Sequence, residues 1–311
     1  MQDDYTSLWS YRAKWAYLLS VVGVLLAPVF HVIYISFNEN GYAARIYEFT
    51  FDWYAVVLGD TMLVASLKWT AYLALAAVLT AVPMGLMAAK FYKRSRQKVL
   101  FVTLMLSPLF IPADIMGSSL LVYFKHLNHF FEALNDRLGV TWFYGWFDLG
   151  FTTAMIGQIV YTLPYVFVII LVTMSRYREQ QTEAARSCGA TAWQAFWQVE
   201  FPQIRVGVFS ACAFVVILSF NEATRTALLK GGFDTFSNVL VGQMLNVGMS
   251  GESYAMAGIM SIVSMLVVGT ILIYTLFKSA RSGHEMRAKA EPIKSSERRG
   301  GKGNLAYFEA R

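Results

Sequence analysis

Six blocks of mostly apolar residues, each about 20 residues or longer, constrain the fold of this chain more than any other feature. Helices of that length cross the hydrocarbon core of a bilayer, where only a helix or a closed barrel satisfies every backbone polar group. Of the 311 residues only 15% are charged, whereas about a quarter are charged in an average soluble domain. The chain is therefore expected to be an all-α, polytopic membrane protein with six transmembrane helices.

The expected spans cover about residues 15–37, 61–91, 99–124, 151–174, 206–229 and 255–277. Prolines within four of them predict kinks, which membrane helices tolerate where neighbouring helices or water satisfy the freed carbonyls. The six helices form one transmembrane domain over residues 15–280, preceded by a short N-terminal segment, residues 1–14. The basic tail, residues 281–311, is poor in apolar residues and is expected to be disordered.

Lysine and arginine predict the orientation of the chain in the membrane. Twenty of the 26 basic residues fall on one side: before the first span, between the second and third, between the fourth and fifth, and after the sixth. Because basic loops remain in the cytoplasm, both termini and the segment at residues 179–202 are expected to be cytoplasmic. The polar, acidic N-terminus lacks the positive region of a cleavable signal peptide, so the first span is expected to be retained.

Several kinds of chemistry have no support in the sequence. The two cysteines lack the spacing of metal ligands, and of the four histidines only His126 and His129 could share a helix face, with no third ligand beside them. The only Gly-Lys pair, Gly301-Lys302, is followed by Gly303, so the chain has no Walker A loop to hold nucleotide phosphates. We therefore expect a subunit that is not an enzyme, binds no metal, cofactor or nucleic acid, and depends on another polypeptide for any ATP hydrolysis.

A polar, helix-forming segment, the 179–202 loop, lies between the fourth and fifth spans. It contains Glu183-Ala184-Ala185, then Gly189 after three residues, then Val199-Glu200-Phe201-Pro202 after nine more. This spacing resembles the EAA loop of the permease subunits of binding-protein-dependent ABC importers. That family's pattern is Glu-Ala-Ala, three residues, Gly, nine residues, Ile, one residue, Leu-Pro. Val199 and Phe201 replace the Ile and the Leu with other apolar residues.

The residues of the 179–202 loop also predict its local structure. Residues 179–188 are good helix formers, and Gly189 can adopt a positive φ that ends the helix. A second helix is expected over residues 191–198, and Pro202 is expected to interrupt it where the chain re-enters the membrane. The alternative is a solvated amphipathic loop in which the spacing is fortuitous.

The resemblance implies a function for the loop and a set of partners. The fold would be that of a type I ABC importer permease, in the bacterial inner membrane. The loop would sit in a groove of an ATPase subunit, where Glu183 pairs with a basic residue. The full set of coupling residues is expected to be Glu183, Ala184, Ala185, Gly189, Ala190 and Pro202. The expected partners are a second permease subunit, more readily a different chain than an identical one, two ATPase subunits that carry ATP and Mg²⁺, an extracytoplasmic binding protein and the lipid bilayer.

Two shorter matches resemble the polyamine and opine branch of these permeases. Ser219-Phe220-Asn221-Glu222 is similar to a Ser-x-Asp-Asp sequence in the fifth span of that branch, and Pro108, Pro112 and Asp114 are similar to a proline-rich segment followed by an acid. Asn221 replaces the first acid, and Arg225 has no expected counterpart. The implied solute is small and charged, either a polyamine or an opine-like or amino-acid-like molecule.

Ionisable groups within membrane spans indicate either a transport path or an internal ion pair. Glu222 and Arg225 are three residues apart and share a helix face, so either role is open to them. Asp114 either lines the path or caps the helix that restarts after Pro112. The predicted path residues are Asp114, Asn221, Glu222 and Arg225. The alternative function is a stand-alone secondary transporter driven by an ion gradient, which usually shows an inverted repeat; we find no convincing one here.

The extracytoplasmic segment at residues 125–149 is rich in aromatic residues, which include Trp142, Phe143, Tyr144 and Trp146. Two interpretations remain open. The aromatic residues form a belt at the membrane interface, or they form short interfacial helices on which the binding protein docks.

Overall fold

The computed structural model describes residues 8–40, 46–141, 145–270 and 273. Residues 1–7 of the expected N-terminal segment and the whole of the basic tail therefore lie outside the described residues, whereas residues 8–14 already belong to the first helix. In these ranges the regular structure is helical, apart from one isolated bridge between Asn38 and Phe49. The chain divides into two units, Met1–Met265 and Leu266–Arg311, and the functional residues discussed below all belong to the first.

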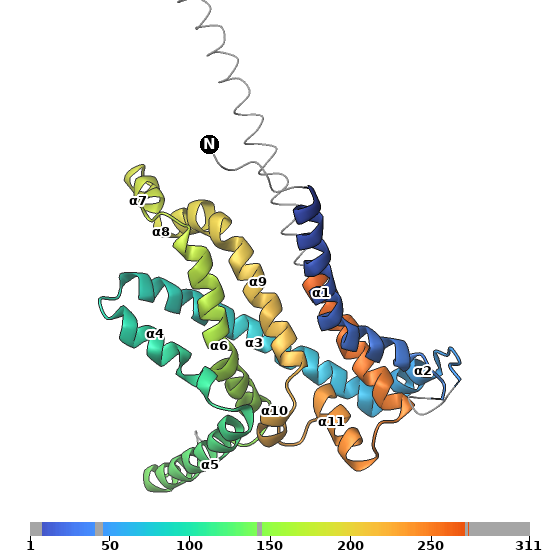
Figure 1. The fold of residues 1–311 in the computed structure, drawn as a ribbon. Helices are drawn as coiled ribbons and strands as arrows, with labels where there is room; N and C mark the ends of the chain where they lie inside the picture. The colour runs from blue at the N-terminus through green and yellow to red at the C-terminus, as the bar shows by residue number, and fades with distance from the viewer. Residues whose placement is uncertain (1–7, 41–45, 142–144, 271–272, 274–311) are drawn as a thin grey trace, which may run out of the picture. The chain divides into compact units, whose positions relative to one another are not determined.

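The helices follow one another along the chain as labelled in Figure 1. They are α1 (Leu8–Ser36), α2 (Asp52–Gly59), α3 (Thr61–Arg94), α4 (Lys98–Leu106), the 3₁₀ turn η1 (Ser107–Phe110), α5 (Ala113–Leu138), α6 (Phe151–Ser175), α7 (Gln180–Ser187), α8 (Ala192–Ala195), the π-helical segment η2 (Phe196–Glu200), α9 (Phe201–Phe220), α10 (Thr224–Leu229) and α11 (Phe236–Asn246). A last helix covers Gly251–Thr270. Five of the described helices are long and apolar enough to cross a membrane, and a sixth span is formed if one bent pair counts as a single crossing.

That bent pair is the expected third span. The segments Lys98–Phe110 and Ala113–Leu138 meet at an angle of 101°, which is a break rather than the predicted kink. The cause lies in two prolines: Pro108 lies in the short η1 turn, and Pro112 forces extended backbone on Ile111 before it. Helix α5 then runs to Leu138, well beyond the expected end of the span, and stops at Gly139, where φ is +63°.

Helices α3, α6 and α9 pack against one another and form the largest core cluster (Figure 1). Small residues every fourth position on α3 permit this close approach: Ala77, Ala81, Gly85 and Ala89. A Cβ atom at Gly85 would overlap Val166 of α6. In lipid, close packing of this kind replaces the hydrophobic effect as the force that holds helices together.

The fifth span differs from the expectation at both ends. Pro202 does not interrupt a helix, because α8, η2 and α9 form one helix of 29 residues, Ala192–Phe220. The amide of Phe201 bonds to the carbonyl of Phe196, five residues earlier, and this wider π turn accommodates a proline that can donate no hydrogen bond. At the other end α9 stops at Phe220, and the short α10 follows after a break at residues 221–223.

Candidate functional site

The 179–202 loop folds as the predicted helix–turn–helix. Helix α7 ends at Ser187, and Gly189 follows with φ at +93°, a conformation that disfavours any residue with a Cβ atom. The amide of Ala190 donates to the carbonyl of Ala185 at 3.1 Å, which closes the turn. Thr191 then starts α8 with a capping box: its hydroxyl accepts from the Gln194 amide, and its own amide donates to the Gln194 side chain at 2.9 Å.

The predicted coupling residues of this loop differ in exposure. Glu183, Ala184 and Gly189 are exposed, whereas Ala185, Ala190 and Pro202 are half-buried. A Cβ atom at Gly189 would meet nothing within 4 Å, so the backbone conformation alone, rather than crowding, requires glycine there.

Two tryptophans on the same loop were not among the predicted residues. Trp193 is 71% exposed and Trp197 is 43% exposed, and their rings pack edge to face at 5.4 Å. Trp197 also contacts Phe201 at 4.7 Å, which places the pair at the start of the long α9 helix. Their four-residue spacing within a polar segment is the sequence signal that could have identified them.

The base of the 179–202 loop is held by two lysines of α3. Lys90 Nζ lies 2.9 Å from Glu200 Oε1 and 4.1 Å from the centre of the Phe196 ring. Lys93 Nζ lies 3.6 Å from Glu179 Oε1 and donates to the Tyr177 carbonyl oxygen at 3.3 Å. In the sequence these lysines indicated only the orientation of the chain, because nothing in their spacing shows what they contact.

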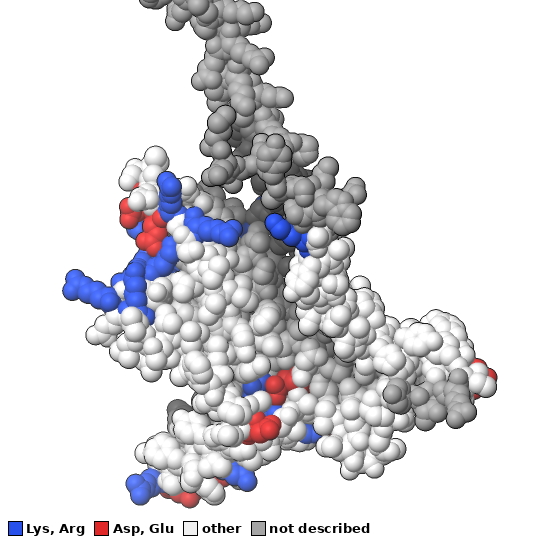
Figure 2. Space-filling model, viewed as in Figure 1, with Lys and Arg blue, Asp and Glu red and all other residues white. Residues whose placement is uncertain are grey.

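Charged groups of both signs surround the contact between α3 and the loop. A hollow of about 120 Å³ is lined by Lys90, Arg94, Met174, Tyr177, Glu179, Thr182, Glu183, Arg186 and Glu200. Figure 2 shows basic side chains gathered with acidic ones where Figure 1 labels α7 and α8. Burial, and then the carboxylates of Glu200 and Glu179, raise the pKa of the Tyr177 hydroxyl above its ordinary value.

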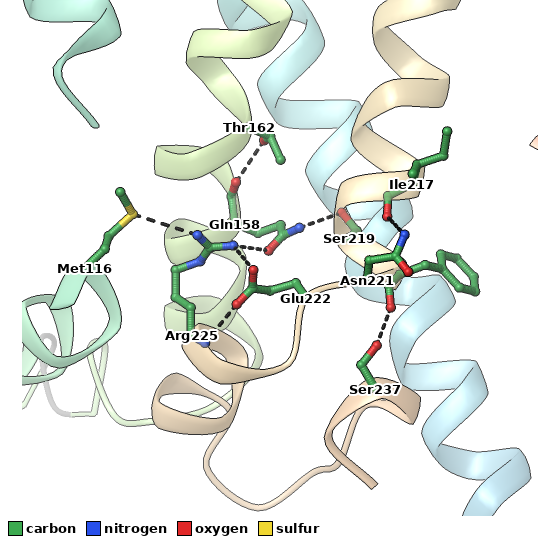
Figure 3. A network of polar contacts seen from close by, with 10 residues as sticks. Met116, Gln158, Thr162, Ile217, Ser219, Asn221, Glu222, Arg225 and Ser237 are labelled. Atoms are coloured by element: carbon green, nitrogen blue, oxygen red, sulfur yellow. Dashed lines mark hydrogen bonds and ion pairs between the residues drawn. The ribbon is translucent and has the colours of Figure 1, made fainter. Parts of the chain in front are cut away.

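A second polar cluster lies where α9 breaks (Figure 3). Arg225 of α10 is only 1% exposed, and its Nη2 atom lies 2.7 Å from Glu222 Oε2. The other carboxylate oxygen of Glu222 accepts from the Arg225 backbone amide at 2.8 Å, so the same side chain also caps the first turn of α10. One carboxylate oxygen thus meets the guanidinium and the other the backbone amide, so both are satisfied within the protein.

Side chains from α5 and α6 complete the enclosure of Arg225. Its guanidinium stacks over the Tyr161 ring at 4.0 Å and donates to Gln158 Oε1 at 3.4 Å. Gln158 in turn donates to Ser219 of α9 at 2.8 Å, and Met116 of α5 lies 3.9 Å from Arg225 Nη1. The cluster thus joins four helices, and sequence reasoning missed Gln158 and Tyr161 because neither carries a charge.

The structure brings together two of the four predicted path residues. Glu222 and Arg225 form the ion pair, one of the two roles left open by their spacing. Asn221 is exposed at the helix break and donates to the Ile217 carbonyl at 2.9 Å. Asp114 is exposed in the first turn of α5, two residues after the N-cap Pro112, so it does not serve as the cap itself.

Arg225 is buried within this one subunit, with its side chain 1% exposed and paired with Glu222. That Asp114, Asn221, Glu222 and Arg225 line the path stays a prediction. Among the described residues, no three His, Cys, Asp or Glu side chains are grouped so that they could hold a metal ion.

Known proteins resemble this chain over most of its length. It is 24% identical over 275 residues to the putrescine transport system permease protein PotI of Escherichia coli K12. The matched region covers 87% of this chain and 93% of the relative. It is 23% identical over 260 residues to the spermidine/putrescine transport system permease protein PotC of Haemophilus influenzae, covering 81% and 92%.

A chain in the crystal structure of a bacterial alginate ABC transporter, in complex with an alginate pentasaccharide-bound periplasmic protein, has the same fold. The TM-score is 0.60 at 16% identity, over 85% of this chain and 92% of that one. The pattern of the binding-protein-dependent transport system inner membrane component family matches residues 81–281, which is more than half of the chain. The chain therefore belongs to this family, the permease subunits of binding-protein-dependent ABC importers.

Proposed function

We propose that this permease subunit forms half of the translocation path for a small polyamine, and that its 179–202 loop couples the path to a separate ATPase subunit. The observation that carries the coupling proposal is the loop itself. It is a folded helix–turn–helix that exposes Glu183, Ala184 and two tryptophans although it lies between two membrane spans. Exposed aromatic residues on an ordered surface of this kind favour a protein partner.

The geometry of the loop suits the transmission of movement. Since α8, η2 and α9 form one helix from Ala192 to Phe220, a displacement of the loop displaces the whole fifth span. Trp193 and Trp197 lie at the start of that helix, where their rings could fill a hydrophobic groove of the ATPase. Glu183 on α7 would face a basic residue at the rim of the same groove.

The polyamine assignment has two supports. The names of the relatives PotI and PotC give putrescine and spermidine as the transported solutes. In this chain Asp114 and Asn221 are exposed and can face a solute between two permease subunits, while Glu222 is neutralised by Arg225. Of the four predicted path residues, Asp114 then carries the charge that is not paired, and a carboxylate favours a cation.

The proposal includes a set of partners and an orientation. The termini and the 179–202 loop lie in the cytoplasm with two ATPase subunits, and a second, related but different permease completes the path. A binding protein delivers the solute on the opposite side, where Phe130 and Trp146 are exposed. In that region Asn128 ties the chain back to α5, since its side chain accepts from the Phe147 amide at 3.1 Å and donates to Asp148 at 2.9 Å. Trp142, Phe143 and Tyr144 lie outside the described residues.

The test is ATP hydrolysis by the complex of two permeases and two ATPases in lipid nanodiscs, measured with the binding protein and a panel of solutes. We expect putrescine or spermidine to stimulate hydrolysis, and zwitterionic amino acids and small anions to leave it at the basal rate. Stimulation by the zwitterions or anions instead would overturn the polyamine assignment. Failure of the chain to co-purify with any ATPase would overturn the coupling role.

A further inference from the structure

Two lysines near the end of α3 contact opposite arms of the 179–202 loop. Lys90 meets the arm that follows Gly189: it pairs with Glu200 at 2.9 Å and lies over Phe196 at 4.1 Å. Lys93 meets the arm that precedes α7: it lies 3.6 Å from Glu179 and 5.4 Å from the centre of the Tyr177 ring. Each ammonium group therefore has one carboxylate and one aromatic ring as neighbours, and the two lysines stand three residues apart on one helix face.

The Lys90 contact is shielded from water more than a typical surface ion pair. The Glu200 side chain is 10% exposed and that of Lys90 is 35% exposed. Exposed pairs contribute little because water and salt screen them, whereas a carboxylate that loses its partner in a shielded site remains desolvated and unpaired. The Lys93–Glu179 pair is longer, and Glu179 is more exposed, so we assign the larger effect to Lys90.

These ionic contacts are the main polar connection between α3 and the loop. The space beside them is a hollow whose lining is mostly charged. Deeper in the protein α3 packs tightly against α6 and α9 through its small residues. A movement of the loop would thus reach the cytoplasmic end of α3 through Lys90 and Lys93, and from there the packed centre.

We propose that Lys90 and Lys93 are positioning residues that clamp α3 to both arms of the coupling loop, so that α3 moves with the loop when the ATPase subunits close. The proposal rests on the proposed function, because it assumes that an ATPase binds the loop. It adds a second connection by which movement of the 179–202 loop reaches the membrane domain. Besides the continuous helix α8–η2–α9, the loop would also move α3.

The experiment uses the whole importer in proteoliposomes and measures the number of solute molecules imported per ATP hydrolysed. We expect Lys90→Glu and Glu200→Lys each to lower this ratio about tenfold, a typical size for coupling between two sites, while the ATPase remains bound. The exchanged pair Lys90→Glu/Glu200→Lys should recover the ratio to within about threefold of the wild type, since it restores the ion pair but not the contact with Phe196. Lys90→Arg should retain coupling, because it keeps both the charge and the cation–π contact.

Arg96→Glu is the matched control. It makes the same change of charge in the same cytoplasmic segment, and Arg96 is exposed. If a charge-reversal variant does not reach the membrane, Lys90→Met and Glu200→Gln replace it, and the double variant should then be no worse than either single one.

The outcomes separate the clamp from the proposed function. Loss of the ATPase from the wild-type complex would overturn the coupling role of the loop. If the ATPase binds but Lys90→Glu has wild-type coupling, or the exchanged pair is as poor as the single variants, only the clamp is overturned. A fall in the amount of protein with an unchanged ratio of solute to ATP would also overturn the clamp, because it would show a role in folding alone.

Discussion

At the scale of single residues, position 189 requires glycine because of its backbone conformation, and not because neighbouring atoms leave no room for a side chain. Its φ of +93° strains any residue with a Cβ atom, although the space around it is open. We expect Gly189→Asp to abolish transport and to release the ATPase, because the turn between α7 and α8 changes shape, while membrane insertion stays normal. Uptake and ATPase co-purification measure this.

Gly59→Ala is the control for that substitution. A Cβ atom at Gly59 would also meet nothing within 4 Å, but its backbone has no positive φ. It should retain wild-type uptake, and normal uptake by the Gly189→Asp variant would contradict the role of the turn.

Asp114 and Glu222 are both acids in the membrane region, yet the structure gives them different surroundings. Asp114 is exposed, so Asp114→Asn should leave the stability of the protein unchanged and lower the uptake of a dication. The expected change is about tenfold in the solute concentration that gives half-maximal uptake, similar to other single charge contacts. Uptake kinetics with purified binding protein held in excess measure it, and unchanged kinetics would remove Asp114 from the path.

For the buried pair Glu222–Arg225 we predict a loss of stability, whereas for Asp114 we predict a loss of uptake. Glu222→Gln leaves the Arg225 guanidinium charged and without its carboxylate, which costs about 3 kcal/mol in similar buried pairs. We expect a clear fall in the thermal unfolding temperature in detergent. The double variant Glu222→Gln/Arg225→Met should recover most of it, since no buried charge remains. If the double variant were less stable than Glu222→Gln, an unpaired buried charge would not be the cause of the loss, and the ion pair drawn in Figure 3 would not stabilise the protein in this way.

At the scale of helices, the sequence predicted which segments are helical and where the helix axis changes direction. It did not predict the angle of each bend. The length of an apolar block and the presence of a glycine after a helix-forming segment can both be read from the sequence. The spans and the Gly189 turn could therefore be predicted. The consequence of a proline depends on its surroundings. Pro112 produces a break of 101° with η1, whereas Pro202 is accommodated by the π turn of η2.

The geometry of the candidate site could be predicted only where it follows from one continuous motif. The helix–turn–helix around Gly189 follows from the spacing within residues 183–202, and the pairing of Glu222 with Arg225 follows from helical periodicity. The coupling role of the loop stays a prediction. The contacts of Lys90 and Lys93 join α3 to residues more than 80 positions later, since Lys93 bonds to Tyr177 across 84 residues. Such contacts depend on the packing of α3, α6 and α9 and leave no local pattern in the sequence.

The close packing of these helices predicts the effect of a small substitution. A Cβ atom at Gly207 of α9 would overlap Thr173 of α6. We expect Gly207→Val to lower the free energy of unfolding by about 1–3 kcal/mol through overpacking, and Thr173→Ala to relieve part of the effect. Thermal unfolding in detergent measures both. Gly23→Val in α1, where a Cβ atom would meet nothing within 4 Å, is the control, and an equal loss of stability there would show that packing is not the cause.

At the scale of the whole molecule, one subunit must bind partners on two sides of a membrane with a single set of helices. The 179–202 loop suits one of these tasks, because it ends in the helix that continues across the membrane as α9. A partner that grips the start of that helix can move it as a rigid rod, and Trp193 and Trp197 offer the largest exposed apolar surface there.

We therefore expect Trp193→Ala/Trp197→Ala to weaken ATPase binding at least about tenfold, as loss of aromatic anchors does at other interfaces. Membrane insertion and thermal stability should not change, because both rings are substantially exposed in the single subunit. Titration of purified ATPase onto the permease in nanodiscs measures the affinity. Val99→Ala, at a residue that is 82% exposed at the start of α4, controls for the loss of exposed apolar surface elsewhere. Unchanged affinity of the double variant would place the ATPase contact elsewhere, on Glu183 and α7 alone, and the continuous helix would then lose its role as the lever of the fifth span.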